Sequence, residues 1–488
     1  MLNRRRLLGW ATAGGVVGGA ALLPSVLTRE PSPGGADHTG HAPADGAAAG
    51  GGRPAAGLGV SFSQRLPIPQ ELTPVRRRDG VDVYKIPIKT AQHAFQPGKP
   101  TTVRSFGGLF VGPTIRAKTG TPVEVTFTNQ LDVPSNVHLH GGHNAHADDG
   151  YPMDVLNPGQ SRTYHYPNRQ QGATLWYHDH AHHLEAENVY RGLHGLYIID
   201  DDAERGLNLP SGQYDVPLMI RDIQLDANGA MVYPNFPPDR TTTLVNGVET
   251  PYFQVAARKY RFRLLNSAND RQFRLTLGGL QMTQIGSDGG LLPAPVQRSE
   301  ILLGSAERAD IVVDFSRVPL GSHLVLQDIY GPVMRFDVTR LAVDTSRVPA
   351  VLRPLPALGP ATVQREITLR FDETGTVGLV NDQPYDPNRV DLKVKRGTTE
   401  IWTVRNTDTV RGIPHSFHLH LEQFRVLDRN GGPPAPDDAG RKDTVNLDPG
   451  EWIRVQTTFT DYVGRYVYHC HFLEHSSIGM MAEMEIVP

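Results

Sequence analysis

The sequence carries one arrangement of histidines twice, once near each end of the chain. Residues 134–140, "PSNVHLH", resemble residues 414–420, "PHSFHLH", and each segment follows a run that ends in asparagine. Further along, the proline of "NPGQSRTYHY" and the proline of "DPGEWIRVQT" each precede a second His-x-His by twenty residues. Two coincidences of residue type and spacing indicate an internal duplication. The two ends of the chain are therefore predicted to fold in the same way.

A weaker third copy lies between the two. The segment "YRFRLLNSANDRQFRLTL" places Arg274, Leu275 and Thr276 where the His-Leu-His triplet would fall, so this copy carries no ligands there. Short alternating runs such as "TEIWTVRNT" recur between turns, and the chain has 50 glycines and 39 prolines. Short strands at regular spacing predict β-sandwiches. The sequence thus predicts an all-β protein of three related sandwiches, at 59–200, 201–350 and 351–488.

The N-terminus is typical of an export signal. In "NRRRLLGWATAGGVVGGAALL", adjacent arginines precede an uncharged run rich in Gly and Ala, which predicts a twin-arginine-type signal over 1–28. A membrane anchor is the alternative, but the run from Leu7 to Thr28 contains five glycines and Pro24. Residues 29–58 cannot bury a core and predict a disordered linker. We expect an exported, periplasmic or extracellular protein with no stable membrane span.

Four His-x-His pairs point to a metal cluster. On a strand, residues i and i+2 project to the same face, so each pair directs two imidazoles into one space. Imidazole suits copper, zinc, iron and nickel, and eight imidazoles are too many for one ion. The repeat gives two pairs to each end domain, which predicts a cluster of two to three ions where those domains meet. The eight residues are His138, His140, His178, His180, His418, His420, His469 and His471.

The only cysteine marks a second site in the last domain. A single cysteine excludes an intramolecular disulfide. Aligned on the repeat, the last domain has His415, Cys470, His475 and Met480 where the first has Ser135, Asp179, Leu184 and Val189. Two histidines, a cysteine and a methionine form the ligand set of a blue-copper site. The alternative is a buried cysteine beside unrelated histidines.

The neighbours of the cysteine favour copper over zinc. Cys470 lies between His469 and His471, so the two predicted sites share one short segment. An electron could pass between the sites through a few covalent bonds. Zinc has no redox chemistry, so this connection would serve no purpose for zinc.

These motifs resemble those of the multicopper oxidases. "HLHG", "WYHDH", "HSFHLH" and "HCHFLEHSSIGM" are similar to the four copper-binding segments of that family, and "LWYHDHAHHLEAENVYRGLHGLYIID" resembles its bilirubin-oxidase and spore-coat-laccase branch. The resemblance implies three cupredoxin-like Greek-key domains and four copper ions. It places His415, Cys470, His475 and Met480 at a type 1 copper, His138 and His418 at a type 2 copper, and two type 3 coppers at His140, His178, His471 and at His180, His420, His469.

The resemblance also implies an activity. A reducing substrate gives single electrons to the type 1 copper, and the cluster reduces dioxygen to water. By family resemblance, Asp149 and Glu474 would carry protons, although each could be an ordinary solvated carboxylate. His143, His146, His182, His183 and His194 match no ligand position, and we expect them to be supporting or surface residues.

The expected donors are phenols, aromatic amines or bilirubin-like pigments, oxidised by a monomer. A cuprous oxidase of copper tolerance is the main alternative, although the chain has only nine methionines and no methionine-rich segment. A copper-free scaffold would not need a complete ligand set, and copper nitrite reduction needs fewer ligands. The net charge of −3 gives no electrostatic footprint for nucleic acid.

Overall fold

The structure, a computed structural model, describes residues 62–488. The predicted signal at 1–28 and linker at 29–58 lie outside the described residues. Strands dominate, and the α-helices of the described residues are the short α1 (Glu185–Tyr190), α2 (Asp202–Arg205) and α3 (Leu473–Ser477). None of the helices in this part of the chain is long and apolar enough to cross a membrane.

The first domain consists of two sheets. One holds β1 (Arg76–Arg78), β2 (Val81–Gln96), β5 (Val123–Asn129) and β7 (Ser161–Tyr166), with β3 (Lys99–Phe106) paired to β2. The other runs in the order β4 (Gly112–Lys118), β9 (His194–Asp200), β8 (Ala173–His178) and β6 (His138–His140).

The last domain repeats this plan. One sheet holds β23 (Gly378–Val380), β22 (Val363–Phe371), β25 (Thr399–Asn406), β29 (Trp452–Thr458) and β27 (Arg425–Arg429). The other holds β24 (Leu392–Lys395), β31 (Met481–Val487), β30 (Gly464–Cys470), β26 (His415–Leu419) and β28 (Thr444–Leu447). In both domains the strand with the first His-x-His pairs antiparallel with the strand that leads into the second.

The middle domain has the same arrangement with an enlarged first sheet. That sheet holds β12 (Val248–Glu249), β11 (Thr242–Val245), β10 (Asp215–Ile223), β14 (Lys259–Asn266), β19 (Arg308–Asp314), β16 (Met282–Ser287) and β17 (Gly290–Arg298). The second holds β13 (Tyr252–Ala257), β21 (Gly331–Leu341), β20 (His323–Asp328), β15 (Phe273–Leu277) and β18 (Glu300–Leu303). β15 carries the Arg-Leu-Thr triplet and has the same place in its sheet that β26 has in the last domain.

One asparagine makes the same turn in each domain. Asn129, Asn266 and Asn406 end equivalent strands, and the side-chain oxygen of each accepts a 2.9 Å hydrogen bond from the backbone N–H two residues on. Each side-chain amide also donates to two backbone carbonyls, which fixes the chain where it leaves the sheet. The asparagine at the end of each repeated run is therefore buried and structural.

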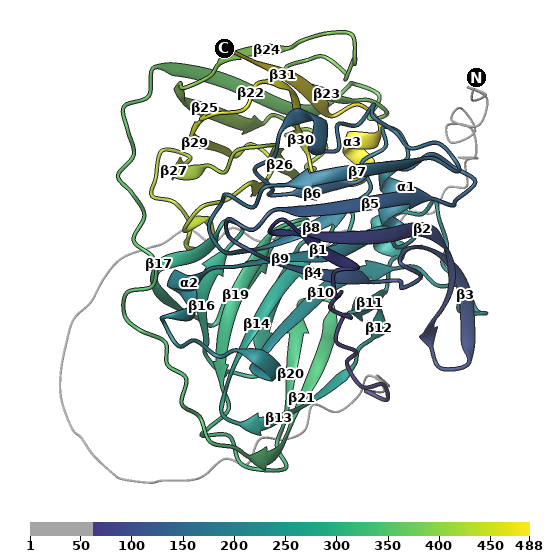
Figure 1. Ribbon diagram of the computed structural model, residues 1–488, viewed down its shortest axis with the longest axis vertical. Coiled ribbons are helices and arrows are strands. Elements are labelled where there is room, and N and C mark those ends of the chain that lie inside the picture. The colour runs from purple at the N-terminus through teal and green to yellow at the C-terminus, as the bar shows by residue number, and fades with distance from the viewer. Residues whose placement is uncertain (1–61) are drawn as a thin grey trace, which may run out of the picture. The chain divides into compact units, whose positions relative to one another are not determined.

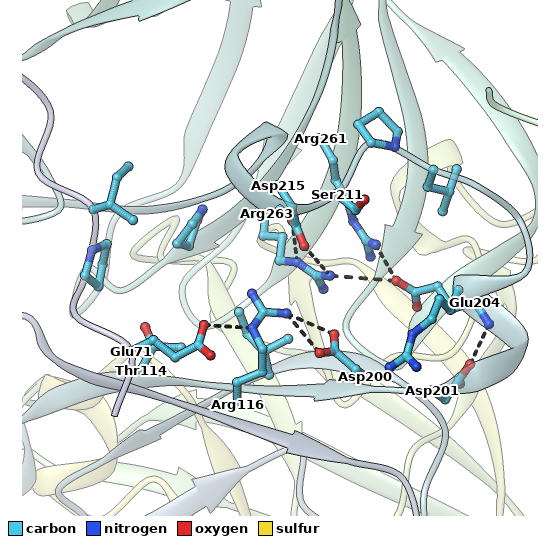
Figure 2. Close-up of a pocket in the computed structure, with 18 of the residues that line it drawn as sticks. Glu71, Thr114, Arg116, Asp200, Asp201, Glu204, Ser211, Asp215, Arg261 and Arg263 are labelled. Carbon is cyan, nitrogen blue, oxygen red and sulfur yellow. Dashed lines mark hydrogen bonds and ion pairs between the residues drawn. The ribbon is translucent and has the colours of Figure 1, made fainter. Parts of the chain in front are cut away.

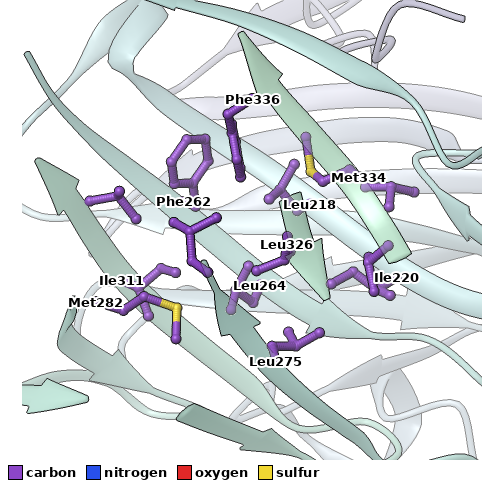
Figure 3. Packing of buried hydrophobic residues seen from close by; sticks show 14 of the residues in the cluster. Leu218, Ile220, Phe262, Leu264, Leu275, Met282, Ile311, Leu326, Met334 and Phe336 are labelled. Atoms are coloured by element: carbon purple, nitrogen blue, oxygen red, sulfur yellow. The ribbon is translucent and has the colours of Figure 1, made fainter. Parts of the chain in front are cut away.

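The cores lie between the paired sheets. Alternate residues of β5 and β25 are buried, as expected for strands with one face on a core. Figure 3 shows the middle core, where Phe262 and Leu264 of β14 face Leu326, Met334 and Phe336 from the other sheet. These observations confirm the predicted all-β fold of three sandwiches (Figure 1).

Candidate metal centre

The eight histidines of the four His-x-His pairs come together between the first and last domains. All eight are at most 1% exposed. Register aligns His138 with His178 on β6 and β8, and His418 with His469 on β26 and β30. The two sets then meet face to face, since the ring centroids of His140 and His418 are 3.8 Å apart. The folding of each copy therefore places its imidazoles against those of the other.

Hydrogen bonds to backbone carbonyls fix how four of these eight rings point. The Nδ1 atoms of His138, His178, His418 and His469 lie 2.6–2.9 Å from backbone carbonyl oxygens. A carbonyl only accepts, so each Nδ1 carries the proton and each Nε2 keeps a lone pair. The Nε2 atoms of His138, His178 and His418 are buried without a hydrogen-bond partner among the described residues.

The unpaired lone pairs fit metal ions. A buried acceptor without a partner is costly, and a bound cation would satisfy it. His180, His420 and His469 offer ring nitrogens within 4.8 Å of one another, and so do His138, His418 and His420. The Nε2 atoms of His180 and His420 each lie 3.2 Å from that of His469, which makes a converging set.

Burial keeps the cluster imidazoles neutral. It lowers the pKa of His178 to about 3 and that of His469 to about 4, and the nearby His469 and Arg308 lower the pKa of His178 further. The pKa values of the other six lie well below the usual range for the same main reason. Neutral imidazole is the form that binds metal, so no proton has to leave these rings first.

The second group lies around Cys470. The Nδ1 atoms of His415 and His475 are 3.1 Å apart, and they lie 3.8 and 3.5 Å from the cysteine sulfur. The Ser416 N–H donates to the sulfur at 3.3 Å. Met480 is fully buried, and its backbone bonds to both Cys470 and His475. Burial raises the pKa of Cys470 to about 12, so the thiolate requires a cation beside it.

The two predicted carboxylates have different surroundings. Asp149 is buried, and its Oδ2 accepts from Nδ1 of His420 at 2.8 Å, while Oδ1 lies 3.7 Å from His138. Glu474 instead accepts hydrogen bonds from Arg240 at 2.7 Å and Asn269 at 2.9 Å. One oxygen of each, Asp149 Oδ1 and Glu474 Oε2, is buried without a hydrogen-bond partner in the described residues.

Of the five histidines that match no ligand position, four hydrogen-bond to protein groups. His143 lies 2.8 Å from Asp461, and His183 lies 2.7 Å from the Ser477 carbonyl. His146 contacts the Arg465 carbonyl. His182 stacks on His183, and His194 is buried 3.4 Å from an Arg221 nitrogen.

Sequence reasoning missed three charged residues beside the two groups. Asp443 lies 2.9 Å from Nε2 of His140, and Arg308 of the middle domain pairs with that carboxylate. Asp408 lies 3.4 Å from Nε2 of His415. All three stand outside the repeated motifs, and only the position of Asp443 directly before β28 could have drawn attention to it.

Two cavities of similar size lie in different places in the fold. Figure 2 shows a cavity of about 690 Å³ whose charges are paired, with Arg263 bonded to Asp215 and Arg116 to Asp200. A second cavity, of about 620 Å³, is lined by Pro414 and Phe472 among others. The Phe472 ring lies 5.2 Å from that of His475, so this second cavity adjoins the cysteine group.

Comparison with known proteins agrees with this architecture. Family models described as multicopper oxidase match residues 87–204, 220–341 and 359–488. A laccase of Bacillus subtilis is 37% identical over 87% of this chain and 98% of its own. A bilirubin oxidase of Albifimbria verrucaria is 36% identical over 86% of this chain and 80% of its own. A solved laccase of Pediococcus acidilactici superposes with a TM-score of 0.83 at 32% identity, covering 88% of this chain and 95% of that one.

Three cupredoxin-like sandwiches with buried histidines between the first and last define a class of copper-dependent oxidoreductases that use oxygen. The chain belongs to the multicopper oxidase family and is laccase-like within it.

Proposed function

We propose that this protein holds four copper ions and couples oxidation of aromatic donors to reduction of dioxygen to water. The observation that carries the proposal is the set of buried, inward-facing imidazole nitrogens without hydrogen-bond partners in the described residues. The proposed type 1 ligands are His415, Cys470, His475 and Met480; the type 2 ligands are His138 and His418; and the two type 3 sets are His140, His178, His471 and His180, His420, His469.

The chain connects the two sites by its backbone. Bound copper would supply one-electron redox chemistry at the cysteine group and dioxygen reduction at the histidine cluster. Cys470 is joined by peptide bonds to His469 and His471, whose rings belong to the cluster. The last two residues of β30 thus belong to different sites, which supports electron transfer between them.

Asp149 and Glu474 are the proposed proton carriers. Dioxygen reduction to water consumes four protons, and the cluster is closed off from solvent by burial. Asp149 touches His420 directly, and its free Oδ1 can hold a proton beside the cluster. Glu474 is anchored by Arg240 through one oxygen, so its free Oε2 can hold a proton in a fixed position.

The donor is proposed to bind in the cavity beside Phe472. Its rim includes Ile329 and Tyr330, which are 65% and 76% exposed and offer apolar surface to an aromatic ring. The proposed donor is a phenol, an aromatic amine or a bilirubin-like pigment, whose ring would pack on this apolar surface.

A cuprous oxidase remains the second candidate, but less supports it. The methionines that follow Cys470 most closely in the sequence are Met480, Met481 and Met484, and all three are fully buried. They offer no exposed thioether surface to an incoming cuprous ion.

Export and a monomeric state complete the proposal. A twin-arginine route would carry the folded protein, with its copper sites already shaped, to the periplasm or the exterior. Replacing Arg4 and Arg5 with lysine should abolish export, and unchanged export would contradict this route.

The proposed oligomeric state is a monomer. Size-exclusion chromatography with light scattering should give the mass of a single chain, and a dimer mass would contradict the monomer.

Oxygen uptake tests the function. Copper-loaded protein is given a phenol, bilirubin or cuprous ion, and uptake should be fastest with an aromatic donor. Fastest uptake with cuprous ion would favour the second candidate. No uptake with any donor, despite four bound coppers, would refute the oxidase proposal.

A further inference from the structure

We propose that Asp443, held by Arg308 of the middle domain, is a positioning residue that makes His140 offer Nδ1 to the cluster. This inference rests on the proposed function, because it assumes that the histidine cluster binds copper. It gives the ligand-free middle domain a direct part in building the metal site.

His140 uses its two ring nitrogens in the opposite way to the neighbouring histidines, with Nε2 hydrogen-bonded and Nδ1 left free. The four histidines anchored by backbone carbonyls present Nε2, whereas Nε2 of His140 lies 2.9 Å from Asp443 Oδ1 and 3.1 Å from the Thr444 hydroxyl. A carboxylate only accepts, so Nε2 carries the proton and Nδ1 keeps the lone pair. Nδ1 of His140 is buried without a hydrogen-bond partner in the described part of the chain.

Asp443 is itself held by a bidentate hydrogen bond from Arg308. Nη1 of Arg308 donates to Oδ1 at 2.8 Å, and Nη2 donates to Oδ2. Both side chains are at most 1% exposed. A guanidinium fork fixes the plane of a carboxylate as well as its distance, so Arg308 sets the direction from which Oδ1 meets His140.

Arg308 is held in turn by two other segments of the chain. Its Nε donates to the carbonyl of Thr174 on β8 at 3.0 Å, and its backbone N–H donates to Asp288 at 2.8 Å. Asp288 also lies 3.3 Å from Lys442, the residue before Asp443. The contact has no spare room, because a Cβ on Gly141 would come within 2.7 Å of Asp443 Oδ2. One arginine thus connects all three domains at His140.

Asp443 makes no contact with the cysteine group. Copper binding at the cysteine group therefore serves as an internal reference for copper binding at the cluster. The Asp443 side chain contacts His140, Thr444 and Arg308, while Cys470 contacts His415, His475 and Ser416. Loss of Asp443 should therefore weaken copper binding at the cluster and leave the blue absorption of the type 1 copper unchanged.

Asp443→Asn is the decisive variant. An amide has one oxygen and one NH₂, so whichever way it turns, the NH₂ faces an Arg308 donor. Glu400→Gln is the matched control, because Glu400 is a fully buried carboxylate of the same domain that accepts two hydrogen bonds from Arg365, at 2.6 and 2.8 Å. Copper per chain is measured against a graded chelator, together with the electron paramagnetic resonance spectrum and the thermal midpoint of the copper-free protein.

We expect Asp443→Asn to weaken copper binding at the cluster by about 10- to 100-fold and to change the electron paramagnetic resonance spectrum. Glu400→Gln should change neither the copper affinity nor the spectrum. Native copper affinity and spectrum in Asp443→Asn would overturn the inference. If Asp443→Asn does not fold, Arg308→Lys is the variant to measure, because it keeps the Asp443 carboxylate but removes the guanidinium fork. Unchanged copper affinity of the cluster in Arg308→Lys would overturn the inference. A native protein that binds no cluster copper would instead refute the proposed function.

Discussion

Replacing Arg263 with methionine should destabilise the protein strongly, because it removes the arginine that hydrogen-bonds to the buried Asp215. Both nitrogens of the guanidinium fork bond to Asp215, at 2.8 and 2.9 Å, and the two side chains are only 2% and 9% exposed. Removing one partner of such a pair costs about 3–5 kcal/mol, since the other charge stays in a site of low polarity. Arg263 also donates to Thr174 on β8, so it connects the middle domain to the strand that carries His178.

The free-energy cost of losing Arg263 depends on the burial of its ion pair. An exposed ion pair in the same domain provides the control. Arg274 pairs with Glu300 at 3.0 Å in the same domain, but these side chains are 47% and 41% exposed. Arg274→Met should therefore cost no more than about 1 kcal/mol. The double variant Arg263→Met/Asp215→Leu should recover most of the loss, because it removes both charges.

The assay is urea unfolding of the copper-free protein, followed by far-ultraviolet circular dichroism. The midpoint should fall sharply for Arg263→Met, slightly for Arg274→Met, and return toward native in the double variant. Equal midpoints for the two single variants would refute the argument from burial.

Three further results are expected. Burial raises the pKa of Glu185 to about 8 from an ordinary value of 4.5, so its contribution to stability is lost as pH rises from 4.5 through 8. Glu185→Gln should then raise the thermal midpoint of the copper-free protein more at pH 9 than at pH 5, and an equal gain at both would contradict this. Cys470→Ser should lose one copper per chain and the blue absorption while the cluster copper stays, and retained blue colour would refute the ligand assignment. Phe262→Ala should reduce the free energy of unfolding by about 3–5 kcal/mol, measured by denaturant titration, because Phe262 is fully buried in the middle core; a loss below 1 kcal/mol would contradict that packing.

The repeat made much of the fold predictable. Alternating strands and paired His-x-His triplets are local patterns, so they indicated sandwiches and the meeting of two histidine sets before any contact was known. The asparagine before each triplet was visible too, and Asn266 has the same role in the copy that lacks ligands.

Contacts between distant segments could not be predicted. Asp443 is separated from His140 by 303 positions and from Arg308 by 135, and no local pattern connects them. Likewise Glu474 precedes His475 in sequence, but its hydrogen bonds run to Arg240 and Asn269 of the middle domain. Such partners depend on how three domains pack, which periodicity does not encode.

The ratio of donor oxidised to oxygen consumed tests the central claim most directly. With copper-loaded protein and a one-electron phenolic donor, both quantities are followed in one closed cell together with hydrogen peroxide. Complete reduction of dioxygen to water predicts four donor molecules oxidised per dioxygen and no peroxide. Two donors per dioxygen with accumulating peroxide would contradict the proposed four-electron cluster.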